Sequence, residues 1–336
     1  MTFLLDSYID SLSNLPESAF DDMIRSTVMV TIVLGDIYED LEADPEPALD
    51  DCLRRQLTVL DDVRRLAVHR VPRQVGSASV DTAELFESAW TAFSPATYDH
   101  SVSLVEARLR ASGINETYLA GKRCFDGGCG IGRLSVALAR MGAGEVVAGD
   151  IGAASLSYLK DTCARLGIST ITPVEQDVTN LSNWADGTFD FVASYGVLHH
   201  TPDCLGGLRE HFRVLKPGGE LWLYLYGDGG MYWPVYDRLR DVVGRYPLAA
   251  VKKALAGLNL REGLYYTYLD NVLAPRTYHL ESDIVALLRE IDPSLTWRRA
   301  QGTSPVDDND LCLATGYGAA VVGPEGEVRI IVRKSI

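Results

Sequence analysis

The segment Arg123–Asp150, RCFDGGCGIGRLSVALARMGAGEVVAGD, decides the fold class of this chain. Its first half carries an acidic residue and three glycines at every second position: Asp126, Gly128, Gly130 and Gly132. A short apolar run precedes this stretch and a helical pattern follows it over Leu134–Met141, which predicts a strand, a glycine turn and a helix. Glycine lets the backbone turn tightly there and lets a ligand approach closer than any Cβ would permit.

A second strand is predicted directly after this helix. Apolar residues return over 146–148, and the run ends at Asp150, twenty residues beyond Gly130. An acidic group at that place can accept hydrogen bonds from the hydroxyls of a ribose. The motif alone is weak evidence for any one activity, since nucleotide-binding dehydrogenases use a similar turn.

The alternation of strands and helices continues beyond Asp150. Helical patterns cover 156–166 and 204–215, and strand patterns cover 170–174, 189–194 and 220–226. Strands that alternate with helices of ten or so residues predict a parallel, doubly wound sheet. The ligand of such a sheet binds at the carboxyl ends of its strands.

Composition limits the classes of partner. The chain has 336 residues, 47% of them hydrophobic, and a formal net charge of −15, which disfavours nucleic acid as a substrate. Its six cysteines form no C-x-x-C pair, so we expect reduced, mostly packing thiols and no metal site. The N-terminus lacks the pattern of a secretory signal, and the longest apolar run, Val28–Leu34, is too short for a membrane span. We therefore expect a cytoplasmic protein with no membrane partner.

Residues 1–110 form an acidic block, with 20 Asp and Glu against 9 Arg and no Lys. Apolar residues recur in it at helical spacing in two runs, which are parted by Pro45 and Pro47. The block reads as an N-terminal helical extension that packs on the core. A second interpretation is that part of it covers the active site as a lid or forms a homodimer interface.

An aromatic-rich stretch precedes the first strand. Trp90, Phe93, Tyr98 and His100 are predicted in or beside a loop before a helix that starts near Ser101. Such a loop can fold across a bound ligand. The alternative is that these aromatic residues only anchor the extension to the core.

Five features occur in one order along residues 121–226. They are D-G-G-C-G-I-G, G-D at the second strand end, Q-D-V at the third, F-D-F-V-A-S-Y-G-V-L-H-H-T-P-D at the fourth, and L-K-P-G-G before the fifth. Together they resemble the class I S-adenosylmethionine-dependent methyltransferases, in the group with a V-L-H-H motif. The resemblance implies a Rossmann-like, mostly parallel, seven-stranded sheet with an antiparallel last strand.

The resemblance also implies a set of residues that hold S-adenosylmethionine. Gly128, Gly130 and Gly132 would pass beside its methionyl part, with Asp126 near the amino group. Asp150, followed by Ile151, would accept the ribose hydroxyls, and Asp177 with Val178 would bind the adenine. Ser194, Gly196 and Val197 would line the floor near the methyl group. The chain departs from the family pattern at Gly127 and Cys129, and at Tyr195, which we expect to narrow the cavity.

Candidate catalytic groups are His199, His279 and Tyr98. His199 and His200 follow the strand that would border the methyl group, but V-L-H-H occurs with unrelated substrates, which favours a structural or pocket role for His199 over that of a general base. Candidate substrate contacts are His100, Tyr195, His200, Tyr232, Trp233 and Tyr278. Several of these belong to a long insertion over 227–290, which is predicted to form an aromatic-rich helical cap.

Two local predictions concern the end of the chain. Ser282 is predicted to cap a helix over 284–290, which places His279 just outside a helix start. Residues 291–336 are predicted to complete the sheet with two strands, in LTWRRAQGTS and EVRIIVRKS, the second preceded by a hairpin through Gly323–Gly326. The predicted domains are therefore an extension (1–110), a cofactor-binding core (111–226), a cap (227–290) and C-terminal strands (291–336).

These patterns predict a methyltransferase that acts on a small organic acceptor at oxygen, nitrogen or carbon, with specialised metabolism as its setting. Two alternatives remain at this point. One is a protein or peptide methyltransferase whose acidic N-terminal part recognises a partner. The other is a regulatory subunit that binds S-adenosylmethionine without catalysis.

Overall fold

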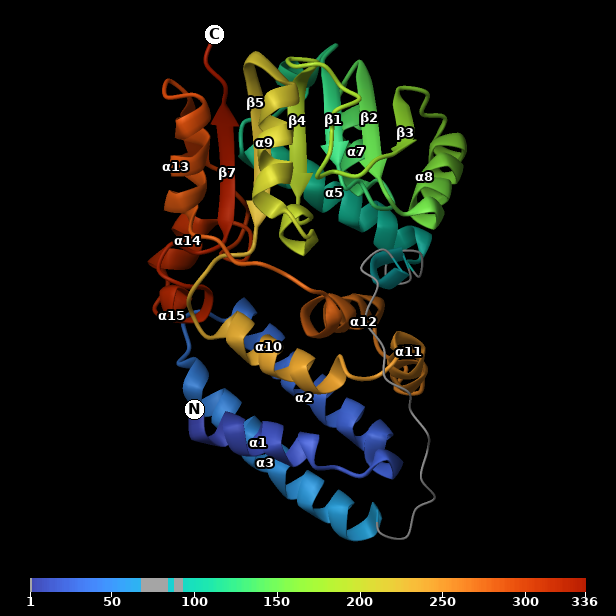
Figure 1. The fold of residues 1–336 in the computed structure, drawn as a ribbon, viewed down its shortest axis with the longest axis vertical. Helices are drawn as coiled ribbons and strands as arrows, with labels where there is room; N and C mark the ends of the chain where they lie inside the picture. Colours follow the sequence, from blue (N-terminus) through green and yellow to red (C-terminus); the bar gives the residue numbers. More distant parts are fainter. Residues whose placement is uncertain (1, 68–83, 88–92) are drawn as a thin grey trace. The chain divides into compact units, whose positions relative to one another are not determined.

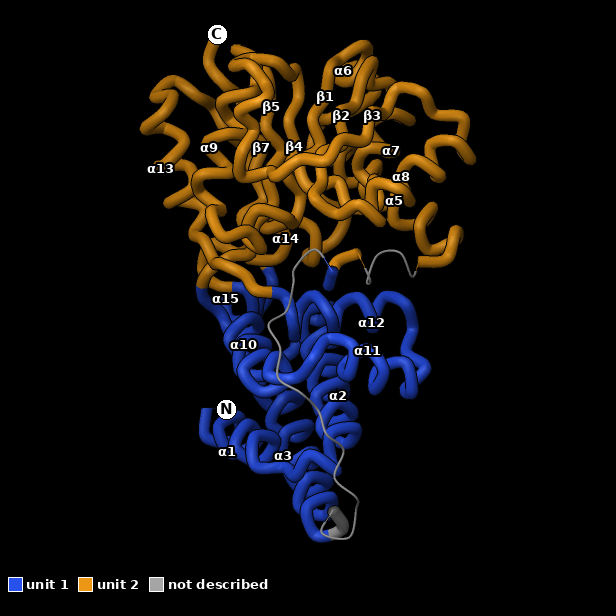
Figure 2. Tube along the Cα trace, turned by 45° about the vertical axis from the view of Figure 1, so that its right-hand side comes forward, with its two compact units in different colours: residues 1–85, 229–274, 315–322 blue, residues 86–228, 275–314, 323–336 orange. Residues whose placement is uncertain are grey.

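The computed structural model describes residues 2–67, 84–87 and 93–336. The chain forms two compact units, coloured separately in Figure 2. The helical unit comprises residues 1–85, 229–274 and 315–322, and the sheet unit comprises residues 86–228, 275–314 and 323–336. Each unit is thus assembled from three separate stretches of chain.

The sheet unit contains a seven-stranded sheet in the order β3-β2-β1-β4-β5-β7-β6 (Figure 1). The strands are β1 (Arg123–Gly127), β2 (Glu145–Asp150), β3 (Ile171–Glu175), β4 (Phe189–Tyr195), β5 (Leu215–Leu225), β6 (Thr296–Arg299) and β7 (Val328–Arg333). Neighbours among β1 to β5 pair in parallel, and β7 runs antiparallel to both β5 and β6. The predicted doubly wound sheet with an antiparallel last strand is confirmed.

Helices cover both faces of this sheet. The helical elements of the unit are α5 (Pro95–Ala111), α6 (Glu116–Leu119), α7 (Arg133–Arg140), α8 (Ala153–Leu166), η2 (Leu198–His200), α9 (Cys204–Val214), α13 (Glu281–Ile291) and α14 (Asn309–Ala314). Because successive strand residues point to opposite faces, Cys124 packs in the core with α5, α7 and α8, whereas Phe125 packs in the core with α9 and α13. The polar groups that follow the strands are left at one end of the sheet.

The helical unit joins the N-terminal helices to the predicted cap. Its elements are α1 (Thr2–Ser13), η1 (Glu17–Ala19), α2 (Phe20–Glu39), α3 (Pro45–Ala67), α10 (Tyr232–Val243), α11 (Leu248–Ala256), α12 (Glu262–Tyr268), η3 (Leu269–Leu273) and α15 (Gly318–Val322). The hydroxyls of Thr27 and Tyr268 share a hydrogen bond of 2.7 Å, and the rings of Phe20 and Tyr246 lie 4.7 Å apart. The extension and the insertion therefore share one core. The four-part domain division, with its assigned roles, stays a prediction.

Helix α5 begins earlier than predicted. The side chain of Ser94 accepts a hydrogen bond from Thr97 N, and Pro95 occupies the first helical turn, where its missing N–H costs nothing. The prediction of a helix start near Ser101 was wrong, and Tyr98 and His100 lie on a helix instead of a loop. Trp90 lies outside the described residues.

Two local predictions near the C-terminus were also wrong. Helix α13 begins at Glu281, and Ser282 lies inside it, where its N and Oγ both donate to the Glu325 carboxylate at 2.8 Å. A carboxylate from another segment thus replaces the predicted side-chain cap. Residues 318–322, predicted as part of a hairpin, form helix α15, and β7 pairs only with β5 and β6 in the described sheet.

Within the described ranges, no helix is both long and apolar enough to cross a membrane. The same residues hold no group of three or more His, Cys, Asp or Glu arranged to bind a metal ion. All six cysteines are buried as free thiols.

Candidate functional site

The glycine turn between β1 and α7 has a backbone that other residues rarely adopt. The φ angles of Gly128, Gly130 and Gly132 are 79°, 51° and 82°. A Cβ on Gly128 would overlap the side chain of Val197, and one on Gly132 would overlap that of Leu159. Both backbone angle and packing therefore require glycine, and Val197 from the end of β4 lies directly against the turn.

Asp150, at the end of β2, holds this turn in place. Its Oδ2 accepts a hydrogen bond from Gly130 N at 2.7 Å, and its Oδ1 accepts one from Gly152 N at 2.8 Å. Burial raises the pKa of Asp150, and the bonds from Gly152 and Gly130 oppose this shift. The sequence pattern located Asp150 but assigned it to a ribose alone. No local signal shows that this side chain also fixes the turn.

Asp126, at the end of β1, is 2% exposed. Its Oδ2 accepts a hydrogen bond of 2.6 Å from Ser135 Oγ on α7. Burial raises the pKa of Asp126 to about 7, against the opposing effect of the Ser135 bond. The carboxyl group thus exists in both protonation states near neutral pH.

The segment after β3 presents Asp177 and Val178. Asp177 is exposed, and its Oδ1 accepts hydrogen bonds from Thr179 N and Thr179 Oγ1, whereas Val178 is buried. The side chain of Gln176 donates to the carbonyl oxygens of Asp177 and Asn180 at 2.9 and 2.7 Å. Side chains of the segment itself, those of Asp177 and Gln176, therefore hold the backbone around the two predicted adenine contacts.

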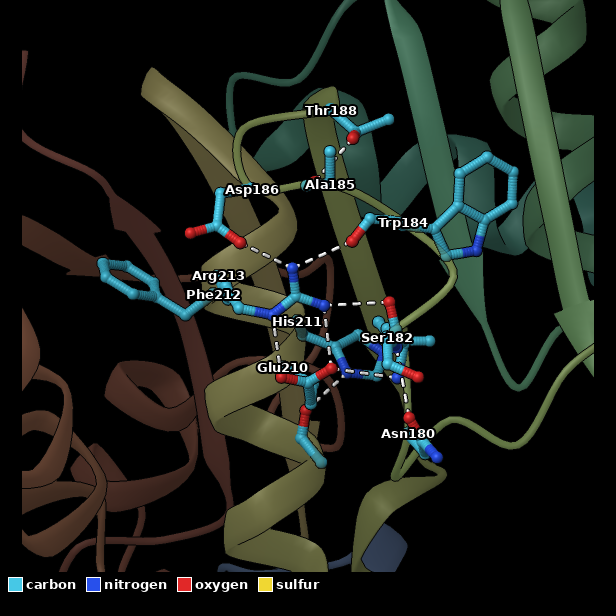
Figure 3. A network of polar contacts seen from close by, with 12 residues as sticks. Asn180, Ser182, Trp184, Ala185, Asp186, Thr188, Glu210, His211, Phe212 and Arg213 are labelled. Atoms are coloured by element: carbon cyan, nitrogen blue, oxygen red, sulfur yellow. Dashed lines mark hydrogen bonds and ion pairs between the residues drawn. The ribbon is translucent and has the colours of Figure 1, made fainter.

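Arg213 on α9 fixes the rest of this loop, as Figure 3 shows. Its guanidinium donates to the carbonyl oxygens of Leu181 and Trp184 at 2.8 and 2.9 Å, and to Asp186 Oδ1 at 2.7 Å. It also forms a two-bond pair with Glu210, whose Oε2 accepts a bond from Leu181 N. The loop after Asp177 is thus anchored to α9, a role that sequence reasoning missed.

The end of β4 carries a buried hydroxyl. Ser194 Oγ is inaccessible to solvent and has no hydrogen-bond partner among the described residues. A buried polar atom without a partner is costly, and a hydroxyl at this place can donate a hydrogen bond to a ligand or a water. Gly196 follows with a φ of 77°, and the ring of Tyr195 stacks on Trp222 at 4.3 Å. The idea that Tyr195 narrows the cavity stays a prediction.

His199, one turn beyond Gly196, is fully buried. Neither ring nitrogen has a hydrogen-bond partner among the described residues, and the ring stacks on Tyr226 at 3.8 Å. Burial, with the nearby His200, holds the pKa of His199 well below its ordinary value. Its imidazole is therefore neutral at physiological pH.

His200 and His279 are held by hydrogen bonds. His200 Nδ1 lies 2.7 Å from the carbonyl oxygen of Pro275, which can only accept, so Nδ1 carries the proton and Nε2 of the neutral ring has a lone pair. His279 Nε2 lies 2.9 Å from Thr277 Oγ1. Burial lowers the pKa of His279, whereas the charges of Asp228 and Asp283 raise it.

The three other candidates in the sheet unit lie in different settings. Tyr98 is buried on α5, and its hydroxyl donates to the carbonyl oxygen of Ile131 in the glycine turn at 3.3 Å. Burial raises the pKa of Tyr98, so its phenol stays protonated and supports the turn. His100 is exposed on the same helix, and Tyr278 is partly exposed. The catalytic role of Tyr98 and the substrate roles of His100 and Tyr278 stay predictions.

Tyr232 and Trp233 belong to α10 of the helical unit, and both are buried there. Asn271 Nδ2 donates to Tyr232 Oη at 3.1 Å, and the rings of Tyr232 and Trp233 meet edge to face at 4.9 Å. These contacts account for both side chains as part of that unit's core. Their contact with a substrate stays a prediction.

The sheet brings the predicted cofactor residues to one edge. They lie at or just after the carboxyl ends of four neighbouring parallel strands, β3, β2, β1 and β4, which point the same way. One further group was missed: Glu87 Oε1 accepts a hydrogen bond from Ala154 N at 2.8 Å, at the start of α8 and next to Asp150. Glu87 lies far from the motifs in sequence, so no spacing could have indicated it.

Comparison with known proteins shows what this part of the chain is similar to. Residues 125–223 match the family model described as a methyltransferase domain. The ubiquinone biosynthesis O-methyltransferase of Xanthomonas oryzae pv. oryzae (strain PXO99A) is 39% identical over 109 residues, 31% of this chain and 43% of that protein. The protein of the same name from Pseudomonas aeruginosa (strain LESB58) is 34% identical over 116 residues, 34% of this chain and 49% of that protein.

The chain therefore spans less than half the length of these two relatives. Among solved structures, a SAM-dependent methyltransferase from Aquifex aeolicus is 21% identical, with a TM-score of 0.36, over 49% of this chain and 89% of that one.

Proposed function

We propose, from the class I S-adenosylmethionine-dependent methyltransferase domain formed by residues 125–223, that this chain transfers a methyl group to a small organic acceptor. Oxygen is the favoured acceptor atom, because two similar proteins are named O-methyltransferases. The observation that carries the proposal is that the Asp150 carboxylate accepts hydrogen bonds from Gly130 N in the glycine turn and from Gly152 N. This carboxylate lies at the edge of the sheet where four parallel strands end.

The residues at this edge fit S-adenosylmethionine. The glycine turn offers bare backbone, and the carboxyl groups of Asp126 and Asp150 suit an ammonium group and ribose hydroxyls. Ile151, which directly follows Asp150, exposes 56% of its surface and offers an apolar contact beside them. Ser194 supplies a buried hydroxyl that lacks a described partner. When bound, the cofactor supplies a methyl group that its sulfonium already makes electrophilic.

The protein's main contribution is positioning. Holding two reacting groups in line is worth about 7 to 11 kcal/mol in favourable cases. Arg213 and Gln176 fix the loop after β3, while Asp150 and Tyr98 fix the glycine turn. Because these supports are internal to the sheet unit, the proposed site is built before a ligand arrives.

A hydroxyl acceptor must also lose a proton, and the geometry favours His200 as the base. The Pro275 carbonyl fixes the tautomer of its ring, so that Nε2 can accept a proton. His199 is sealed in the core, which makes it a weaker base because its charged form is strongly disfavoured. His279 remains the alternative, held by Thr277.

Product formation tests the activity. The chain is incubated with S-adenosylmethionine and a panel of small phenols, alcohols, amines and peptides, and S-adenosylhomocysteine is measured. We expect turnover with at least one hydroxyl compound. Tight binding of the cofactor with no product across the panel, peptides included, would instead indicate a binding or regulatory subunit.

The assignment of the base is tested by His200→Gln, His199→Asn and His279→Asn at saturating cofactor. Loss of a general base lowers kcat by about 100- to 10,000-fold. We expect such a loss for His200→Gln alone. An unchanged kcat in His200→Gln would exclude His200 as the base.

A further inference from the structure

Glu87 lies against the start of α8, beside the Asp150 carboxylate. Its Oε1 accepts the hydrogen bond from Ala154 N at 2.8 Å, and its charge contributes to raising the pKa of Asp150. Gly152 lies between the two side chains. A Cβ on Gly152 would lie 2.9 Å from Glu87 Oε1 and 3.1 Å from Asp150 Oδ1, so glycine at this position lets the two carboxylates come close together.

Two carboxylates close together repel each other, and this arrangement needs a reason. Asp150 already accepts one backbone hydrogen bond on each of its oxygens. A carboxylate accepts about four hydrogen bonds in all, so Asp150 would be saturated if it alone accepted both ribose hydroxyls. A second carboxylate at the same place shares this load and offers each hydroxyl its own acceptor.

We propose that Glu87 binds S-adenosylmethionine, and that Glu87 and Asp150 together accept the hydrogen bonds of its two ribose hydroxyls. This inference rests on the proposed function. The bond to Ala154 does not exclude it, because each carboxylate oxygen can accept more than one hydrogen bond. The competing explanation is that Glu87 only caps the N-terminus of α8, which a carboxylate also stabilises.

A thermodynamic cycle, in which Glu87 and the ligand hydroxyls are changed separately and together, distinguishes the two explanations. The full chain and its Glu87→Ala and Glu87→Gln variants are titrated by calorimetry with S-adenosylhomocysteine, and with its 2′-deoxy and 3′-deoxy analogues. Glu84→Gln serves as the matched control, because Glu84 is an exposed acidic residue three positions earlier. Glu87→Gln keeps an oxygen that can cap α8 but removes the charge.

For the wild-type chain, removing from the ligand the hydroxyl whose hydrogen bond Glu87 accepts should weaken binding about tenfold to a hundredfold. This is the usual effect of losing a hydrogen bond to a charged group. Glu87→Ala should weaken binding of the parent ligand by a similar factor, and removal of that hydroxyl should then have little further effect. Glu87→Gln should show a smaller loss, and Glu84→Gln none.

Two results would overturn the inference alone. One is that Glu87→Ala weakens all three ligands by the same factor, as loss of a helix cap would. The other is that Glu87→Ala binds all three as the wild type does. A wild-type chain that binds none of the ligands would overturn both the inference and the proposed function.

Discussion

Ser135 Oγ donates a hydrogen bond of 2.6 Å to Asp126 Oδ2 inside the sheet unit. The bond joins the end of β1 to the first turn of α7, on either side of the glycine turn. Burial raises the pKa of Asp126 to about 7, although the Ser135 bond favours its ionised form. Asp126 therefore gains or loses its proton in response to small changes in its surroundings, and two predictions follow from this property.

Binding of S-adenosylhomocysteine, the demethylated product of the cofactor, should release a proton from Asp126 below pH 7. At pH 6 Asp126 is mostly protonated, and a ligand ammonium placed beside it would favour the ionised form. Calorimetric titration with S-adenosylhomocysteine, in two buffers of different ionisation enthalpy, measures the released proton directly. We expect a substantial fraction of one proton from the wild-type chain and much less from Asp126→Asn. Equal release from both would place the ammonium elsewhere.

The stability of the chain should also depend on Asp126. Its pKa of about 7 in the folded chain lies above the ordinary value of 3.8, so its contribution to stability is fully present below pH 3.8 and is lost as pH rises through 7. Each unit of pKa difference corresponds to about 1.4 kcal/mol. Asp126→Asn should therefore gain stability relative to wild type between pH 5 and pH 8. Urea unfolding of both proteins at the two pH values checks this, and a constant difference would contradict it.

The sheet was predictable because its signals are local. Each strand of the parallel part is a short apolar run, and each helix between them has its own periodic pattern. The helical unit was not predictable as one body. Thr27 and Tyr268 bond to each other although they lie far apart in sequence, and no periodic pattern reports which two amphipathic helices will pack together.

The places of the candidate site residues at the strand ends were also predictable, whereas their roles stay predictions. Spacing located the strand ends, and with them Asp126, Asp150 and Asp177, because parallel strands end at one edge. It could not show what supports them, since Arg213, Ser135 and Glu87 reach their partners only through the fold. The departure at Gly127 now has a cause: His211 from α9 occupies the space of a Cβ there.

Gly127→Ala should destabilise the sheet unit through this contact with His211. The new methyl group would overlap Nε2 of a ring that is fully buried and hydrogen-bonded to the Gly207 carbonyl through Nδ1 at 2.7 Å. Overpacking of this kind costs about 1 to 3 kcal/mol. Denaturant unfolding should show that Gly127→Ala with His211→Ala is more stable than the sum of the two single changes predicts. Strict additivity would show that the two residues do not compete for space.

Arg213→Lys should weaken the cofactor site without removing a charge. Lysine cannot reproduce the planar fork that reaches Glu210, Asp186 and the loop carbonyls, so the loop after Asp177 should loosen. We expect a severalfold rise in KM for S-adenosylmethionine with kcat at saturation near the wild-type value, since Asp177 and Val178 of this loop are proposed to bind the adenine and not the methyl group. Arg289→Lys, an exposed change on α13, is the control and should alter neither constant. A lower melting temperature with an unchanged KM would mean that Arg213 stabilises the fold but does not position the cofactor.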